Sequence, residues 1–161
     1  MYEFLWSGFQ SSWLVLFIPN PISHIIASKS LVYYLCELSL KGYANINVIA
    51  HSWGTVLSRD AMNSSGLSFG LWATMGSPLG QTHPLFQYQK WQNYFTLADG
   101  VTQLADLLFL MGYENDTIPL FQQLSGVEQH RTLCLNPVTA HSSYWTDPTV
   151  FNDLLQVLKW Q

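Results

Sequence analysis

Apolar residues along the chain alternate between continuous runs and helical spacing, and this alternation predicts strands separated by helices. The run "INVIA" at 46–50 contains β-branched residues and is typical of a buried strand. Residues 54–63 follow with helical spacing, and Ser64-Ser65-Gly66 is expected to end that helix. Further strands are predicted at 2–6, 69–75, 93–97 and 131–135, and a second apolar stretch lies at 13–18.

Three more segments have the pattern of helices. In 28–41 the apolar residues recur at helical spacing, and Lys41-Gly42 suits a helix end. Residues 101–111 are predicted to form an apolar helix. Asp147 is expected to cap a closing helix whose first residue is Pro148. Strands that alternate with helices imply an α/β fold, a mainly parallel sheet with helices on both faces, here in a single domain spanning 1–161.

Composition narrows the class of protein. Hydrophobic residues make up 48% of the 161 residues and charged residues 10%. The charged share is well below the roughly 25% of an average domain, so the chain should be largely buried or expose apolar surface to a ligand or partner. The net charge is −4, without runs of basic residues, which argues against nucleic-acid binding.

Cysteines and membrane signals exclude further classes. Cys36 and Cys134 are interpreted as small buried hydrophobic residues, with a disulfide as the alternative. Their spacing from the histidines does not resemble a zinc site, and no metal or cofactor is expected. The apolar run at 13–19 is shorter than the ~20 residues of a transmembrane helix. The N-terminus has no basic region of the kind that opens a signal peptide, so a cytoplasmic location is the default expectation.

Ser52 lies where the 46–50 strand gives way to a helix, and this position suits a nucleophile. A sharp turn there would lift the hydroxyl above the sheet and aim the amide of Trp53 at a developing oxyanion. Small residues are needed two places to either side, and Ala50 and Gly54 are small. His51 adjoins the serine and cannot easily turn to serve as its base, so it is expected to pack or bond near the corner. The alternative is an ordinary helix-capping serine.

In this context "AHSWG" resembles the Gly-X-Ser-X-Gly nucleophile elbow of the α/β-hydrolase superfamily of serine esterases and lipases, with Ala50 in place of the first glycine. The segment "WQNYFTLADGV" is similar to a Trp-X-Asn…Asp-Pro-Val segment of that family, with Gly100 in place of the proline. The segment "HSSYWTDPTV" is similar to the region that follows the catalytic histidine in bacterial and fungal esterase-like members. The resemblance implies an α/β-hydrolase fold and the hydrolysis of carboxylic esters, including lipids or other apolar acyl esters.

A serine nucleophile needs a general base and an acid that orients the base. In the resembled family the chain order is serine, acid, histidine, with the last two on loops after later strands. Asp99 follows the predicted 93–97 strand and His141 follows the predicted 131–135 strand, so the resemblance assigns them as acid and base. The rival residues are His24 and His83 in loops flanked by proline, His130 before the last strand, Asp60 and Asp106 on helices, Asp116 in a loop, and the cap Asp147.

One part of the family pattern is missing before Ser52. The family has further strands there, and one of them ends in a His-Gly loop that donates a second oxyanion amide and lies beside the elbow strand. We therefore expect an N-terminally truncated α/β-hydrolase fold, with 69–75 on one side of 46–50. The other side is expected to be vacant or filled by 13–18, with Asn20 or Ile22 offering the second amide.

Three functions are consistent with these residues. The first is a serine hydrolase, in which 101–111 and 113–126 form either a cap over an acyl group or ordinary core and surface. The second is an inactive remnant of such an enzyme. The third is an acyltransferase or amidase with the same triad, because the acyl acceptor is chosen by pocket shape and water access.

Overall fold

The computed structural model describes residues 21–79, 84–103, 126–137 and 139–159, in which helices alternate with strands. In chain order the elements are α1 (Pro21–Leu40), β1 (Ile46–His51), α2 (Trp53–Ser65), β2 (Ser68–Met75), β3 (Gln87–Phe95), β4 (Val127–Arg131), α4 (Ala140–Ser143) and α5 (Pro148–Lys159). The predicted α/β class is confirmed. The predicted strand at 2–6 and the apolar stretch at 13–18 lie outside the described residues. So does most of the predicted 101–111 helix, of which residues up to 103 are described as helical.

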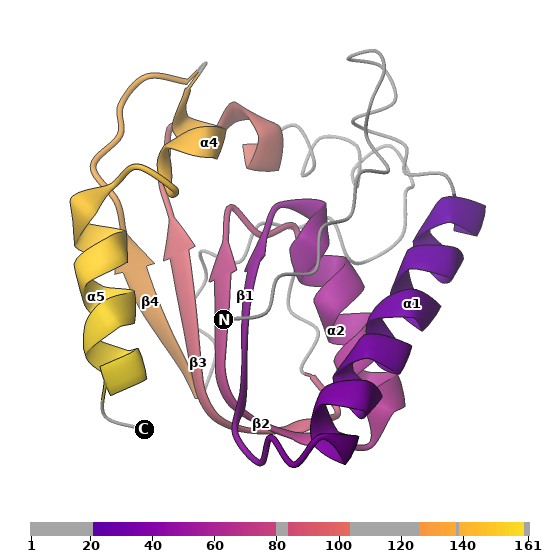
Figure 1. The fold of residues 1–161 in the computed structure, drawn as a ribbon. Helices are drawn as coiled ribbons and strands as arrows, with labels where there is room; N and C mark the ends of the chain where they lie inside the picture. Colours follow the sequence, from indigo (N-terminus) through magenta and orange to yellow (C-terminus); the bar gives the residue numbers. More distant parts are fainter. Residues whose placement is uncertain (1–20, 80–83, 104–125, 138, 160–161) are drawn as a thin grey trace.

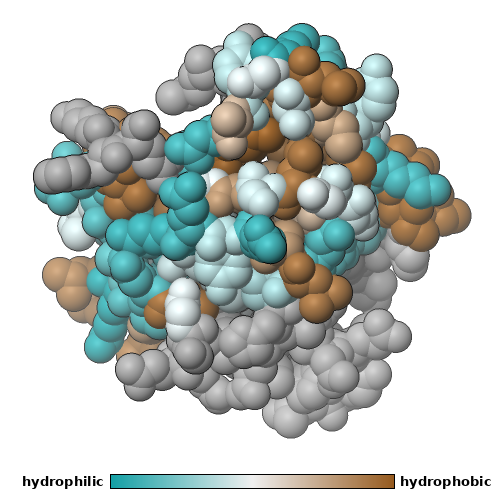
Figure 2. Space-filling view, turned by 90° about the horizontal axis from the view of Figure 1, so that it is seen from below, coloured by the Kyte–Doolittle hydropathy of each residue, from teal (hydrophilic) through white to brown (hydrophobic). Residues whose placement is uncertain are grey.

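The four strands form one parallel sheet in the order β1-β2-β3-β4 (Figure 1). The predicted pairing of the elbow strand with the next strand is confirmed, since β1 pairs with β2. Among the described residues β1 is the end strand, and any pairing of its other side with 1–20 lies outside them. Because the strands are parallel, the segments that follow them all start from one edge, the place where ligands bind in open α/β sheets. The opposite end, seen in Figure 2, has hydrophilic residues interspersed with hydrophobic ones.

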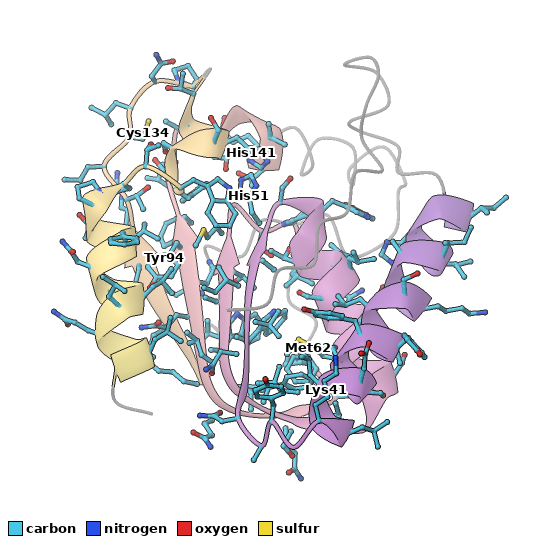
Figure 3. All side chains as sticks on the ribbon, viewed as in Figure 1. Lys41, His51, Met62, Tyr94, Cys134 and His141 are labelled. Atoms are coloured by element: carbon cyan, nitrogen blue, oxygen red, sulfur yellow. The ribbon has the colours of Figure 1, made fainter. Side chains whose placement is uncertain are left out.

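Helices cover both faces of the sheet (Figure 1). On one face α1 and α2 bury the sheet, and Met62 of α2 and Trp72 of β2 are both fully buried there. On the other face Tyr94 of β3 packs with Val150 of α5. Figure 3 shows Met62 and Tyr94 on opposite sides of the sheet. The predicted two-sided covering is therefore confirmed for the described part of the chain.

β4 is the main correction to the predicted elements. It spans Val127–Arg131 and not 131–135. The amide of Thr132 donates to the carbonyl of Phe95 at 2.8 Å, and beyond it Leu133 and Leu135 are exposed. β4 lies at the end of the described sheet, so polar side chains suffice to hold it, and Asn93 donates to Gln129 across the β3–β4 pair at 2.9 Å. The apolar run that suggested 131–135 is thus a connection to α4.

β3 and α1 also start earlier than predicted. β3 begins at Gln87 and ends at Phe95, because buried polar residues such as Asn93 find partners on neighbouring strands and need no apolar run. α1 begins at Pro21 and not at 28, since proline suits the first position of a helix. The predicted strands at 46–50 and 69–75, the helix at 54–63 and the closing helix are confirmed, with shifts at their ends. The Asp147 cap is confirmed, because its carboxylate accepts from the Thr149 amide at 2.8 Å.

The structure tests both predictions made for the two cysteines. Cys36 and Cys134 are both free, so the disulfide alternative is wrong. Both side chains are only partly buried, so the prediction that they are buried hydrophobic residues is also wrong in its extent. Cys134 lies in the connection after β4 and not in a strand.

In the described part of the chain, the helices are too short or too polar to cross a membrane.

Candidate active site

Ser52 joins β1 to α2 with a backbone that favours glycine. Its φ is 55° and its ψ is −132°, and among the described residues it is the one non-glycine residue with positive φ. Such conformations cost ~1–3 kcal/mol and persist only where the surrounding structure enforces them. The side chain makes no hydrogen bond that caps α2, so the helix-capping alternative is wrong. The predicted sharp corner between strand and helix is confirmed.

The corner is held from both of its sides. The Ser52 amide donates to the Met75 carbonyl at 2.9 Å, which continues the β1–β2 pairing past the end of β1. The Ser52 carbonyl accepts from both the amide and the hydroxyl of Thr55, at 2.9 and 2.7 Å. Ser77 donates in turn to the Thr55 hydroxyl at 2.8 Å, and both of these side chains are buried. These bonds enforce the unfavourable backbone of the serine.

His141 lies between Ser52 and Asp99 and bonds to both. Its Nε2 is 2.7 Å from the Ser52 Oγ. Its Nδ1 is 3.0 Å from the Asp99 Oδ1 and 2.9 Å from the Oδ2. An ionised carboxylate can only accept, so Nδ1 carries the proton and Nε2 is left to accept from the serine hydroxyl. The three residues assigned from the sequence are therefore within hydrogen-bond reach of one another, in the order that general-base activation requires.

Asp99 is buried and surrounded by donors. Its side chain is 1% exposed, whereas that of His141 is 18% exposed. The Oδ1 accepts from the amides of Val101 and Thr102 at 3.1 and 3.2 Å, and the Oδ2 accepts from the Tyr144 hydroxyl at 2.9 Å. Burial alone would raise the pKa of Asp99, but His141 and these donors outweigh it and hold the pKa below its usual value. Asp99 is thus ionised at neutral pH and fixed in orientation.

Tyr144 and Gly76 also shape the site, and sequence reasoning missed both. Tyr144 donates to Asp99 and accepts from the Thr96 amide at 3.1 Å. Burial and the charge of Asp99 raise its pKa, so the hydroxyl keeps its proton. A Cβ on Gly76 would lie 2.9 Å from the Asp99 Oδ2 and from the Tyr144 ring, and 3.2 Å from the His141 ring. The sequence signal for this close approach was the glycine itself, because Gly76 directly follows β2, the strand that pairs with β1.

His51 packs and bonds near the corner, as the sequence led us to expect. Its Nε2 donates to the backbone carbonyl of His141, and the two rings lie 4.7 Å apart (Figure 3). Burial, followed by repulsion from His141, lowers the pKa of His51 to about 4. His51 is therefore neutral at pH 7 and joins the end of β1 to the helix that carries His141.

The structure bears differently on the roles expected for Trp53, Ala50 and Gly54. The amide of Trp53 is the first of α2, a position without an acceptor inside the helix and at its positive end. Ala50 is buried, which fits the expected need for a small residue. A Cβ on Gly54 would meet nothing within 4 Å among the described residues outside its own stretch of helix, so a methyl group has room there, and the expected clash of a larger side chain stays a prediction. Of the two residues considered for a second oxyanion amide, Ile22 lies in the first turn of α1 and Asn20 lies outside the described residues.

The other histidines and aspartates that were considered as base or acid bond to residues other than Ser52, so far as the structure describes them. His130 is in β4 and not before it, and bonds to Asp153 at 3.1 Å. His24 is in α1 and not in a loop, and bonds to Asp60 of α2 at 2.9 Å. His83, Asp106 and Asp116 lie outside the described residues. Within the described ranges, His, Cys, Asp and Glu side chains form no group of three that could hold a metal ion.

In comparisons with known proteins, no family model, curated protein or solved structure matches this chain. The family resemblance thus stays a hypothesis, and the function is inferred from the geometry of the site.

Proposed function

We propose that this chain is a serine hydrolase that cleaves carboxylic esters with Ser52 as nucleophile, His141 as base and Asp99 as orienting acid. The proposal depends on one observation, the hydrogen-bonded series from the Ser52 Oγ through His141 to the Asp99 carboxylate. Ser52, Asp99 and His141 follow three different strands, so local sequence does not bring them together. An α/β-hydrolase fold is part of the proposal.

Each residue has a defined step. Ser52 Oγ attacks the ester carbonyl while its proton passes to the Nε2 of His141, and the carbonyl oxygen becomes an oxyanion beside the Trp53 amide. The tetrahedral intermediate collapses, the alcohol leaves with the proton from His141, and an acyl-serine remains. Water, deprotonated by His141, then attacks the acyl group. When this second intermediate collapses, His141 returns the proton to the departing Ser52 Oγ and the acid is released. Asp99 stays ionised and stabilises the His141 imidazolium in both halves of the reaction.

Exposed apolar residues support an apolar acyl or alcohol group in the substrate. Leu97 follows β3, Leu133 and Leu135 follow β4, and Trp145 follows α4. They are 50, 83, 83 and 58% exposed. Leu97, Leu133 and Leu135 follow the carboxyl ends of strands, and Trp145 follows the helix that holds His141. Ser52 lies at the same edge of the sheet, because it follows the carboxyl end of β1. An apolar lining is the usual feature of a small-molecule site.

Covalent labelling tests the nucleophile. A fluorophosphonate probe is expected to label the wild-type chain, with the adduct on Ser52 by peptide mass spectrometry. Ser52→Ala should abolish labelling, and Ser64→Ala on the exposed end of α2 is the matched control that should leave it intact. Labelling that persists in Ser52→Ala would show that the nucleophile is another residue.

Hydrolysis of p-nitrophenyl esters tests the other two roles. His141→Ala should slow turnover about as much as Ser52→Ala, because triad members act as a unit, and Asp99→Asn should cost less than either. Loss of turnover in Asp116→Asn with Asp99→Asn unaffected would overturn the assigned acid. Adding alcohols or amines as competing acceptors separates a hydrolase from an acyltransferase, which would form the new ester or amide in preference to the free acid.

A further inference from the structure

A second hydrogen-bonded series starts one residue after the nucleophile. The indole Nε1 of Trp53 donates to the Nδ1 of His24 at 3.1 Å. The Nε2 of His24 is 2.9 Å from the Oδ2 of Asp60. The Nε and Nη2 of Arg59 both lie 2.8 Å from the other oxygen of Asp60. The series joins the first residue of α2 to the first turns of α1 and back to the middle of α2.

The chemistry of the partners fixes the direction of every bond. An indole N–H can only donate, so the Nδ1 of His24 must carry a lone pair. Burial alone would raise the pKa of Asp60, but the bonds from His24 and Arg59 outweigh it and hold that pKa below its usual value. The ionised carboxylate then accepts from the Nε2–H of His24. His24 is therefore neutral, with one tautomer selected by its two neighbours.

Packing alone does not require this series. α1 and α2 already bury apolar side chains against each other, among them Leu31 and Leu35 of α1 and Val56 of α2. The side chains of His24 and Arg59 are 18 and 9% exposed, so their partial desolvation costs free energy that an apolar contact would not. What directed bonds add over apolar contacts is a fixed position for the group at their end. That group is the side chain of Trp53.

We propose that His24 and Asp60 are positioning residues for the oxyanion amide of Trp53. The inference rests on the proposed function, in which that amide stabilises the negative charge of the tetrahedral intermediate. The bond from His24 fixes the indole, and the fixed indole holds the first peptide unit of α2 in the orientation that the intermediate needs. Because the charge develops only in the transition state, loss of the series should lower kcat and leave KM nearly unchanged.

A double-mutant cycle on p-nitrophenyl ester hydrolysis tests the proposal. His24→Phe keeps a ring of similar size and removes both nitrogens, and Trp53→Phe removes the indole N–H and keeps the backbone amide. Each is expected to lower kcat about tenfold, a part of the ~100- to 1000-fold loss when an oxyanion donor is removed altogether. The double variant should be no slower than the worse single variant, because both remove the same bond. His24→Asn, whose amide can still accept from the indole, should recover part of the activity.

A packing variant and a spectrum distinguish a fixed indole from a merely stable pair of helices. Leu35→Val weakens the same α1–α2 contact and should lower Tm without changing kcat. The indole resonance of Trp53, assigned by its loss in Trp53→Phe, should move upfield in His24→Phe and lose protection from solvent exchange. Additive losses in the cycle, or wild-type kcat in His24→Phe, would overturn the positioning role while ester hydrolysis by the wild type still stands. A wild type that neither hydrolyses esters nor takes the fluorophosphonate label overturns the proposed function, and the oxyanion role of Trp53 with it.

Discussion

The imidazole of His51 lies 4.7 Å from that of His141, and its Nε2 donates to the His141 backbone carbonyl. His51, the residue before Ser52, therefore holds the backbone of His141, which is the base in the proposed mechanism. Trp145 and Tyr144 pack around the ring of His51, at 5.7 and 5.9 Å between centroids. This arrangement needs a neutral His51, because a charged one would face His141 inside a buried site.

His51 should make stability depend on pH between about 6.5 and about 4. Its pKa is lowered from 6.5 to about 4 in the fold, so the unfolded chain binds the proton first as the pH falls. The stability that its neutral form provides is fully present above pH 6.5 and is lost as the pH falls toward 4, up to about 3 kcal/mol. Urea unfolding of the wild type and His51→Phe at steps between pH 4 and 8 measures this. His51→Phe should lose most of that slope.

His51→Gln is the matched control for the hydrogen bond. Its amide can still donate to the His141 carbonyl, so it should keep more esterase activity than His51→Phe while losing the same pH dependence of stability. Equal slopes in the wild type and both variants would mean that another group titrates in this range. Asp99 and Asp60, whose carboxyl pKa values are lowered in the fold, add to the slope only at the acid end of the range, below about pH 5.

Ser52 should be a site where activity and stability oppose each other. Replacing a non-glycine residue at positive φ by glycine relieves backbone strain, so Ser52→Gly should be more stable than Ser52→Ala by about 1 kcal/mol. Both variants lack the hydroxyl and should be equally inactive. Chemical denaturation of the pair measures the difference. Equal stability would show that the corner stores little strain.

The sequence was sufficient where one local signal decides the outcome. The β-branched run before Ser52 and the helical spacing after it predicted the corner, and Asp147-Pro148 predicted the start of α5. The sequence was not sufficient where contacts with residues distant in the chain determine the local structure. The polar strand β4 is held by pairing with β3 that no local pattern reveals, and Arg131 ends it. Tyr144 and Gly76 belong to the site because folding brings them against Asp99, which a single sequence does not show.

Tyr144→Phe should separate the orientation of Asp99 from its charge. The variant removes one donor to the carboxylate and leaves the Thr96 amide without its acceptor in a buried place. An unsatisfied buried group costs ~1–3 kcal/mol, so we expect a loss of stability in that range. With one donor fewer, the pKa of Asp99 should rise, and esterase turnover should fall at acid pH more than at pH 8. Tyr88→Phe, at a partly buried tyrosine on the other face of the sheet, is the control and should keep the wild-type pH profile.

Gly76→Ala should damage the site by displacement of the triad. Its Cβ would stand 2.9 Å from the Asp99 Oδ2 and the Tyr144 ring, and Gly76 also has a positive φ of 51°. Strain alone would cost about 1–2 kcal/mol, and the clash adds a shift of Asp99 relative to His141 that should lower kcat about 100-fold or more. Gly66→Ala separates the two effects, because Gly66 has a φ of 69° and nothing within 4 Å of its added Cβ among the described residues. It should lose similar stability from strain and keep wild-type kcat. If Gly76→Ala retains the kcat of Gly66→Ala, the triad can move aside for a methyl group, and the close approach of β2 to Asp99 has no part in positioning the acid.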